Sequence, residues 1–197
     1  MIEVDALTRM ADSLRVYDVD QDGWEGDPEG SNPKSVESNL THVGKHLAGV
    51  LAFKEFANSD VVQKEIVPDF MQYGLRIARW GGVVLNDLVE LPNLYIKQAR
   101  QINYRISEEF MKRPVLSLML ANGILLGKQM HDEDHESVRQ EAQSLRSGRL
   151  KDVAKILVME AHFQSVDGLF SLEESFEDRL AVLRQRFGIP KPDEKEV

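Results

Sequence analysis

The fold is decided by VVQKEIVPDFMQYGLRIARW, residues 61–80, in which apolar side chains recur every three or four positions. This recurrence is typical of a helix that buries one face, and the face is formed by Val62, Ile66, Phe70, Tyr73 and Ile77. Pro68 interrupts the pattern, because proline has no N–H group to donate and its ring crowds the carbonyl four residues earlier. The stretch therefore predicts one helix over about 60–80 that is bent near 65–68.

The same periodicity continues on both sides of this stretch and predicts further helices. With 60–80 included, the expected helices cover residues 2–16, 37–56, 60–80, 84–90, 93–111, 114–130, 150–169 and 172–187. Residues 133–146 are polar and weakly amphipathic, and no stretch alternates apolar and polar residues as a strand would. We expect an all-α fold, a helical bundle of six to eight helices with a long acidic loop near the N-terminus.

The pattern divides the chain into five segments. They are an N-terminal helix (1–17), an acidic loop (18–36), a helical core (37–112), a C-terminal helical extension (113–190) and a charged tail (191–197). A loop of this length in a compact domain is typically functional or mobile, and the tail is expected to be disordered.

Composition excludes several classes of function. The 197 residues carry a net charge of −9, whereas nucleic-acid and anionic-membrane binding both need a positive field. The chain has no cysteine, which excludes disulfides, thiol nucleophiles and Cys-ligated metal sites. Its longest apolar stretch, 114–127, is shorter than the roughly 20 residues that span a bilayer, and its N-terminus has no apolar signal region. We expect a soluble, cytoplasmic protein.

The acidic loop contains a calcium-binding pattern. Residues 18–29, DVDQDGWEGDPE, match D-x-[DN]-x-[DN]-G-x5-E at every specified position and so resemble an EF-hand loop. The expected Ca²⁺ ligands are Asp18, Asp20, Asp22, the backbone carbonyl of Trp24, and Glu29. The loop departs from the family at Glu25, where an aliphatic residue is usual, and at Gly30 to Pro33, which will not begin a helix. The alternative is a solvated acidic linker.

Two pairs of potential metal ligands lie on consecutive predicted helices. His42 and His46 are four residues apart, as are Glu65 and Asp69, so each pair shares a helix face. If the helices are antiparallel neighbours, the four side chains could hold Mg²⁺, Mn²⁺, Fe²⁺ or Zn²⁺. Carboxylates alone could instead hold Mg²⁺ against a substrate phosphate.

Basic residues near these pairs could bind a triphosphate. They are Lys45, Arg76 and Arg79. The alternative is that Arg76, two turns beyond Asp69 with Gln72 between them, belongs to a structural row of ion pairs on one helix face. Glu160 and His162 on the apolar 150–169 helix also need partners if they are buried.

Residues 65–89, EIVPDFMQYGLRIARWGGVVLNDLV, resemble the second metal-binding helix of the MazG-like all-α nucleotide pyrophosphohydrolases. An acidic pair is followed by an apolar helix with Tyr and Leu-Arg, a Gly-containing turn and a short acidic helix, and residues 42–52 would be the family's first helix. The resemblance implies an oligomeric helical core that binds Mg²⁺ through carboxylates, with Asp69 and Glu65 as catalytic residues. It implies cleavage of a nucleoside triphosphate to the monophosphate and pyrophosphate.

The chain departs from this family in two ways. The acidic pair of the first helix is absent, and the corresponding stretch offers Lys45, His46 and Gly49. The family spaces the second pair as E-x-x-D, whereas here Glu65 and Asp69 are separated by three residues. A non-catalytic, nucleotide-binding relative is therefore an alternative to an active enzyme.

The second half of the chain predicts protein contacts. The helix at 114–130 is hydrophobic on all sides, and the helices over 150–187 add amphipathic faces. We expect a homo-oligomer or a protein partner bound through these C-terminal helices. The alternative function is thus an all-α interaction or scaffold protein with a structural calcium-binding loop.

Overall fold

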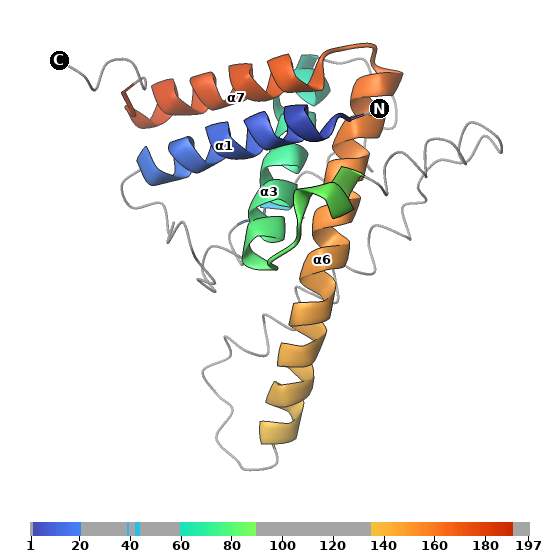
Figure 1. Cartoon of the computed structure of the whole chain (residues 1–197). Coiled ribbons are helices and arrows are strands. Elements are labelled where there is room, and N and C mark those ends of the chain that lie inside the picture. Colours follow the sequence, from blue (N-terminus) through green and yellow to red (C-terminus); the bar gives the residue numbers. More distant parts are fainter. Residues whose placement is uncertain (1, 21–38, 40–41, 44–59, 90–134, 191–197) are drawn as a thin grey trace, which may run out of the picture.

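The computed structural model describes residues 2–20, 39, 42–43, 60–89 and 135–190 (Figure 1). Its elements are α1 (Val4–Asp20), the π-helical turn η2 (Val62–Ile66), α3 (Val67–Trp80), α6 (His135–Asp167) and α7 (Leu172–Phe187). The described residues contain helices and no strand, so the all-α class is confirmed there. They hold five helices, and the expected number of six to eight is not confirmed.

Helix α3 is the centre of the fold. Every residue from Val67 to Ala78 is buried. Helices α1 and α7 lie side by side, and α3 and α6 run beside one another across their direction (Figure 1). A helix buried on all sides has little contact with solvent, so any polar side chain on α3 needs a partner within the protein.

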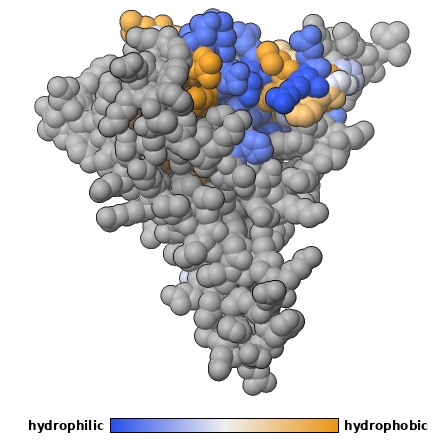
Figure 2. Space-filling view, turned by 180° about the vertical axis from the view of Figure 1, so that it is seen from behind, coloured by the Kyte–Doolittle hydropathy of each residue, from blue (hydrophilic) through white to orange (hydrophobic). Residues whose placement is uncertain are grey.

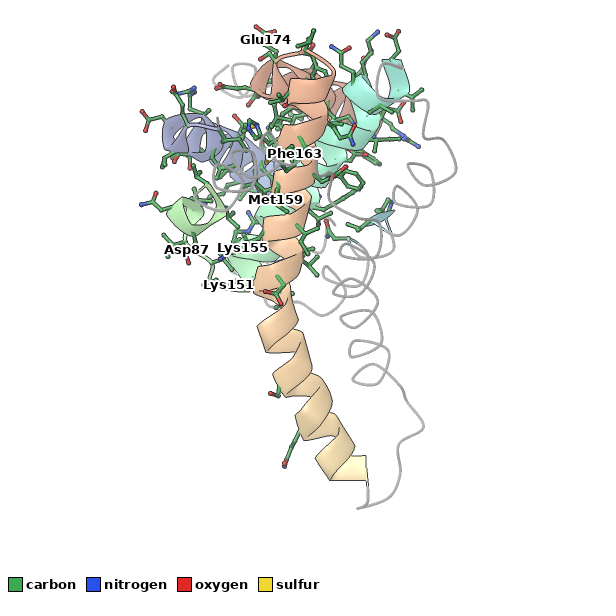
Figure 3. The ribbon with its side chains drawn as sticks, turned by 90° about the vertical axis from the view of Figure 1, so that its right-hand side faces the viewer. Asp87, Lys151, Lys155, Met159, Phe163 and Glu174 are labelled. Atoms are coloured by element: carbon green, nitrogen blue, oxygen red, sulfur yellow. The ribbon has the colours of Figure 1, made fainter. Side chains whose placement is uncertain are left out.

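Two contacts define how α6 runs along α3. A Cβ atom added at Gly74 would lie 2.9 Å from Val158, and one added at Gly81 would lie 3.3 Å from Leu150. Residue numbers thus rise along α3 as they fall along α6, so the two helices are antiparallel. The absence of a side chain at Gly74 permits this close approach. Beyond the end of α3, Lys151 of α6 binds Asp87 at 3.1 Å (Figure 3).

The predicted helix over 60–80 is confirmed, and a π turn lies directly before Pro68 and the α-helix that contains it. Residues 60–80 are continuously helical, with the π turn η2 directly before α3. The N–H group of Val67 donates to the carbonyl oxygen of Val62, five residues earlier. A π turn holds one more residue than an α turn, and the wider turn removes the carbonyl crowding that Pro68 would otherwise cause.

Helix α7 is also confirmed at its predicted bounds. The Ser171 hydroxyl accepts a hydrogen bond from the Glu174 N–H and caps the N-terminus. Gly188, with φ of 66°, ends the helix in the left-handed conformation that glycine adopts at low cost.

Two predicted boundaries are wrong. Helix α1 continues to Asp20, so the acidic loop does not begin at residue 18. Helix α6 is one helix of 33 residues, whereas the sequence predicted a helix only from 150. Gly148 lies within it, which costs a helix only about 1 kcal/mol, and the polarity of 135–149 weakens the periodic signal without preventing a helix.

Three predicted helices, 37–56, 93–111 and 114–130, lie wholly or largely outside the described residues, as does the tail 191–197. Within the part that is described, no helix is both long enough and apolar enough to cross a membrane.

Candidate functional site

A row of polar side chains runs along one face of the buried helix. The row consists of Glu65 in η2 and Asp69, Gln72, Arg76 and Arg79 in α3. Steps of three and four residues keep side chains on one helix face. Asp69, Gln72 and Arg76 are each at most 3% exposed. Burial of these charges requires opposite charges from other elements, because an isolated buried ion is strongly unfavourable.

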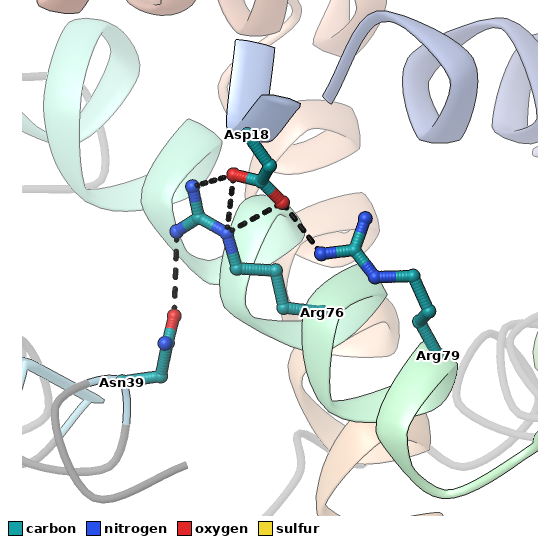
Figure 4. A network of polar contacts seen from close by, with 4 residues as sticks. All are labelled: Asp18, Asn39, Arg76 and Arg79. Carbon is teal, nitrogen blue, oxygen red and sulfur yellow. Dashed lines mark hydrogen bonds and ion pairs between the residues drawn. The ribbon is translucent and has the colours of Figure 1, made fainter. Parts of the chain in front are cut away.

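Arg76 is paired with the end of α1 (Figure 4). Its Nη2 and Nε atoms donate to Oδ1 of Asp18 at 2.6 and 3.0 Å, and its Nη1 donates to Oδ1 of Asn39 at 3.3 Å. The side chains of Arg76 and Asp18 are both 1% exposed. This charged pair therefore joins α1 to α3 inside the core.

Asp18 binds a second guanidinium as well. Nη2 of Arg79 donates to its Oδ2 atom at 2.6 Å (Figure 4). Arg76 and Arg79 are three residues apart on α3, so one carboxylate of α1 binds two neighbouring positive charges of the row. These bonds explain why α1 extends beyond its predicted end, since Asp18 reaches them from a helical position.

The other end of the row is paired with α7. Nε and Nη2 of Arg179 each donate to a different carboxylate oxygen of Asp69, both at 2.9 Å. Nη1 of Arg179 lies 3.8 Å from Oε2 of Glu65. Burial acts to lower the pKa of Arg179, but the hydrogen bond and charge of Asp69 outweigh it and raise the pKa. Arg179 is thus a fixed positive charge shared by two carboxylates.

A third contact joins α7 to α1. Nη1 of Arg184 donates to Oδ2 of Asp20 at 2.9 Å and to the carbonyl oxygen of Pro190 at 3.1 Å. The guanidinium also lies over the ring of Tyr17, 5.6 Å from its centroid, where the cation attracts the ring electrons. Burial raises the pKa of Tyr17, so the phenol stays neutral beside this pair.

Two donors of the row remain without partners in the part of the chain that the structure describes. They are Nε2 of Gln72 and Nε of Arg79. Tyr73 is buried next to the row, and burial raises its pKa, with Asp69 as the next cause. The site is therefore a buried ion-pair network in which the phenol is uncharged.

The described residues that were predicted to bind a metal ion do not all come together. Glu65 and Asp69 meet at Arg179, whereas His42 is exposed with its ring 6.0 Å from that of Tyr73. No group of three or more metal-ligating side chains occurs among the residues that are described. Lys45 and His46 lie outside those residues.

The first two predicted Ca²⁺ ligands, Asp18 and Asp20, are helical. Asp18 and Asp20 end α1, and their carboxylates bind the three arginines Arg76, Arg79 and Arg184. Ca²⁺ coordination by these carboxylates would have to replace those bonds. Asp22, Trp24 and Glu29 lie outside the described residues.

Sequence reasoning missed Arg179, Arg184 and Asn39. Arg179 is three residues from Phe176 and four from Leu183, so it borders the apolar stripe of α7. A charged residue beside such a stripe is a signal for a buried partner. The identity of the partner has no local signal, because Asp69 is 110 residues away.

A separate buried group lies on α6. The side chain of His162 is buried, and its Nε2 atom has no hydrogen-bond partner within the described residues. Burial lowers its pKa from 6.5 to about 4. The imidazole is therefore neutral near pH 7.

Comparison with known proteins gives no relative, since no family model, curated protein or solved structure matches the chain.

The Asp18→Asn variant tests the ion-pair network. It leaves the buried guanidinium of Arg76 without a counter-charge, and we expect the free energy of unfolding to fall by about 3–5 kcal/mol. Urea unfolding followed by circular dichroism measures it. The matched control is Asp60→Asn, because Asp60 pairs with Lys64 at 3.0 Å on the surface and should lose less than about 1 kcal/mol. Equal small losses in both variants would contradict a buried network.

The His162→Leu variant tests the buried histidine. Between pH 6.5 and about 4 the unfolded chain binds a proton at His162 that the folded chain does not, so stability falls as the pH falls. The wild type should lose roughly 3 kcal/mol more than His162→Leu between pH 7 and pH 4. Urea unfolding across this range measures the difference. Identical pH curves for the wild type and His162→Leu would refute the assignment.

Proposed function

We propose that this chain is a non-catalytic relative of the MazG-like pyrophosphohydrolases that acts through contacts of its helices. The observation that carries this proposal is the double hydrogen bond from Arg179 to Asp69. Asp69 is the residue that the resemblance assigns to metal binding and catalysis, and it is 2% exposed. With both oxygens bonded to a guanidinium, the carboxylate is occupied by a cation of the chain itself.

The state of the arginines supports the same proposal. A triphosphate would need guanidinium donors that are accessible from solvent. Arg76 is 1% exposed and gives its donors to Asp18 and Asn39, and Arg79 also binds Asp18. Both guanidiniums are therefore bound by the carboxylate of Asp18 within the protein, and their arrangement suits helix packing better than phosphate binding.

The nucleotide pyrophosphohydrolase is the second candidate function. The observation that favours it is that Glu65 and Asp69, the acidic pair of the resemblance, converge on one positive group. Both carboxylates thus lie beside the same positive charge, as they would beside a bound cation. Mg²⁺ would be its cofactor and a nucleotide its substrate.

A pyrophosphate-release assay separates the two candidates. We expect the wild type to release no pyrophosphate above background from the common NTPs and dNTPs with Mg²⁺ or Mn²⁺, because the Asp69 carboxylate is occupied. The matched control is Asp69→Asn, which should give the same background. Release by the wild type that Asp69→Asn abolishes would contradict the proposal and support the enzyme.

The proposed contact surface includes the turn between α6 and α7. Leu169 in this turn is 92% exposed. Its φ of 56° is in the left-handed region, which costs a leucine roughly 1–2 kcal/mol. Figure 2 shows that hydrophobic and hydrophilic described residues are interspersed on the face it draws, so the exposed apolar residues there do not form one continuous patch. An exposed leucine in a strained turn suits a contact with a second copy of the chain.

The Leu169→Asp variant tests this surface by multi-angle light scattering. We expect the wild type to associate at about 100 µM and the variant to associate at least tenfold more weakly, a change of about 1.4 kcal/mol. The control is Val84→Asp, since Val84 is also exposed, at 62%, but lies outside the C-terminal helices. A monomeric wild type, or equal association of both variants, would refute contact through the turn.

A further inference from the structure

The carboxylates of Glu65 and Asp69 have one positive group in common. Arg179 binds both oxygens of Asp69 at 2.9 Å and approaches Oε2 of Glu65 at 3.8 Å. The Arg179 and Asp69 side chains are 13% and 3% exposed, whereas that of Glu65 is 52% exposed. The positive charge at this site is thus a buried side chain of the protein itself, and Glu65 lies at the solvent-exposed edge of the site.

A divalent metal ion does not fit this arrangement while Arg179 is present. Mg²⁺ and Mn²⁺ take about six oxygen ligands, usually with one or two carboxylates among them. Both oxygens of Asp69 are bound by Arg179 and are not available to a metal ion. The acidic pair that the resemblance assigns to a metal is therefore paired with a positive charge of the protein itself.

The π turn contributes to this arrangement. Glu65 lies in η2 and Asp69 in the first turn of α3. The family that the chain resembles has one residue fewer between its two acids, and a π turn contains one residue more than an α turn. The π turn ends at Ile66, directly after Glu65, and Asp69 lies in α3, yet both acids reach the same guanidinium.

Other contacts of α7 hold Arg179 in position. Arg184, five residues after Arg179, binds Asp20, and Glu173 binds Arg9 of α1 near the start of the helix. Phe176 and Leu180, on either side of Arg179, are buried in the core. These contacts hold α7 in place on both sides of Arg179. They therefore keep its guanidinium beside the two acids, unlike that of a surface arginine.

We propose that Arg179 is an internal cation that occupies the position in which Glu65 and Asp69 would otherwise bind a divalent metal ion. The proposal uses the same site as the proposed function and deepens it, because it states what replaces the metal. Arg179 carries one positive charge and a planar set of donors that matches a carboxylate. Arg179 thus balances one of the two carboxylate charges at every metal concentration.

Removal of the arginine should open the site to metal. The Arg179→Met variant keeps an unbranched apolar side chain and removes the charge. We expect it to bind one Mn²⁺ ion at least tenfold more tightly than the wild type does at this site, as measured from the free Mn²⁺ signal in electron paramagnetic resonance. Mn²⁺ should also raise its melting temperature, because a ligand that binds only the folded state stabilises it.

Three variants serve as controls. Arg186→Met removes an exposed arginine from the same helix, whose guanidinium lies over the Phe187 ring, and should behave as the wild type. Arg179→Lys keeps the positive charge and should keep Mn²⁺ out. Asp69→Asn added to Arg179→Met should remove the new site, whereas Mn²⁺ bound in the acidic loop would be the same in every variant.

The outcomes are decisive even if Arg179→Met unfolds without metal. In that case, recovery of the helical circular dichroism signal on addition of Mn²⁺ supports the proposal, and no recovery at millimolar Mn²⁺ overturns it. Mn²⁺ binding by the wild type that Asp69→Asn abolishes would also overturn it. These results are separate from the pyrophosphate assay, since Arg179→Met can gain a metal site whether or not the wild type is inactive towards nucleotides.

Discussion

The arrangement of the helices depends on the carboxylate of Asp18, which is shared by Arg76 and Arg79 inside the core. Taking these charges out of water is costly, so such a pair contributes little net stability, but removing one partner costs about 3–5 kcal/mol. Apolar contacts alone tolerate several rotations of one helix against another. The shared carboxylate permits a single rotation of α1 against α3, because only that rotation places Asp18 within hydrogen-bond distance of both guanidiniums.

The network also determines what the polar row can do. Aspartate, glutamate and arginine are the residue types that bind metals and phosphates, and they are also the types that neutralise one another. Which role they take depends on whether opposite charges of the same chain reach them first. Here Arg179 reaches Asp69 from α7 and Asp18 reaches Arg76 from α1, so these two charges of the row are paired within the protein.

The bounds of helices with local signals were predictable from the sequence, whereas the partners of the buried charged side chains were not. The helix over 60–80 follows from its apolar stripe and Pro68, and α7 follows from Ser171 and Gly188, since each signal lies within a few residues of its effect. The C-terminal end of α1 and the pairing of Arg179 involve Arg76 and Asp69, which are far away in the sequence. The sequence therefore identified Glu65, Asp69, Arg76 and Arg79 as candidate site residues and left open a structural row of ion pairs through Asp69 and Arg76, but it did not identify Arg179 or Asp18 as their partners.

Pro68 connects the backbone to this charge network. Pro68 lies in the first turn of α3, directly after the π turn. In an uninterrupted α-helix, residues four apart such as Glu65 and Asp69 differ in direction by about 40°. In the π turn each residue advances by a smaller angle, so the two acids come closer to alignment. One guanidinium can then serve both. A feature that appears in the sequence only as a helix breaker thus contributes to the geometry of the acidic pair.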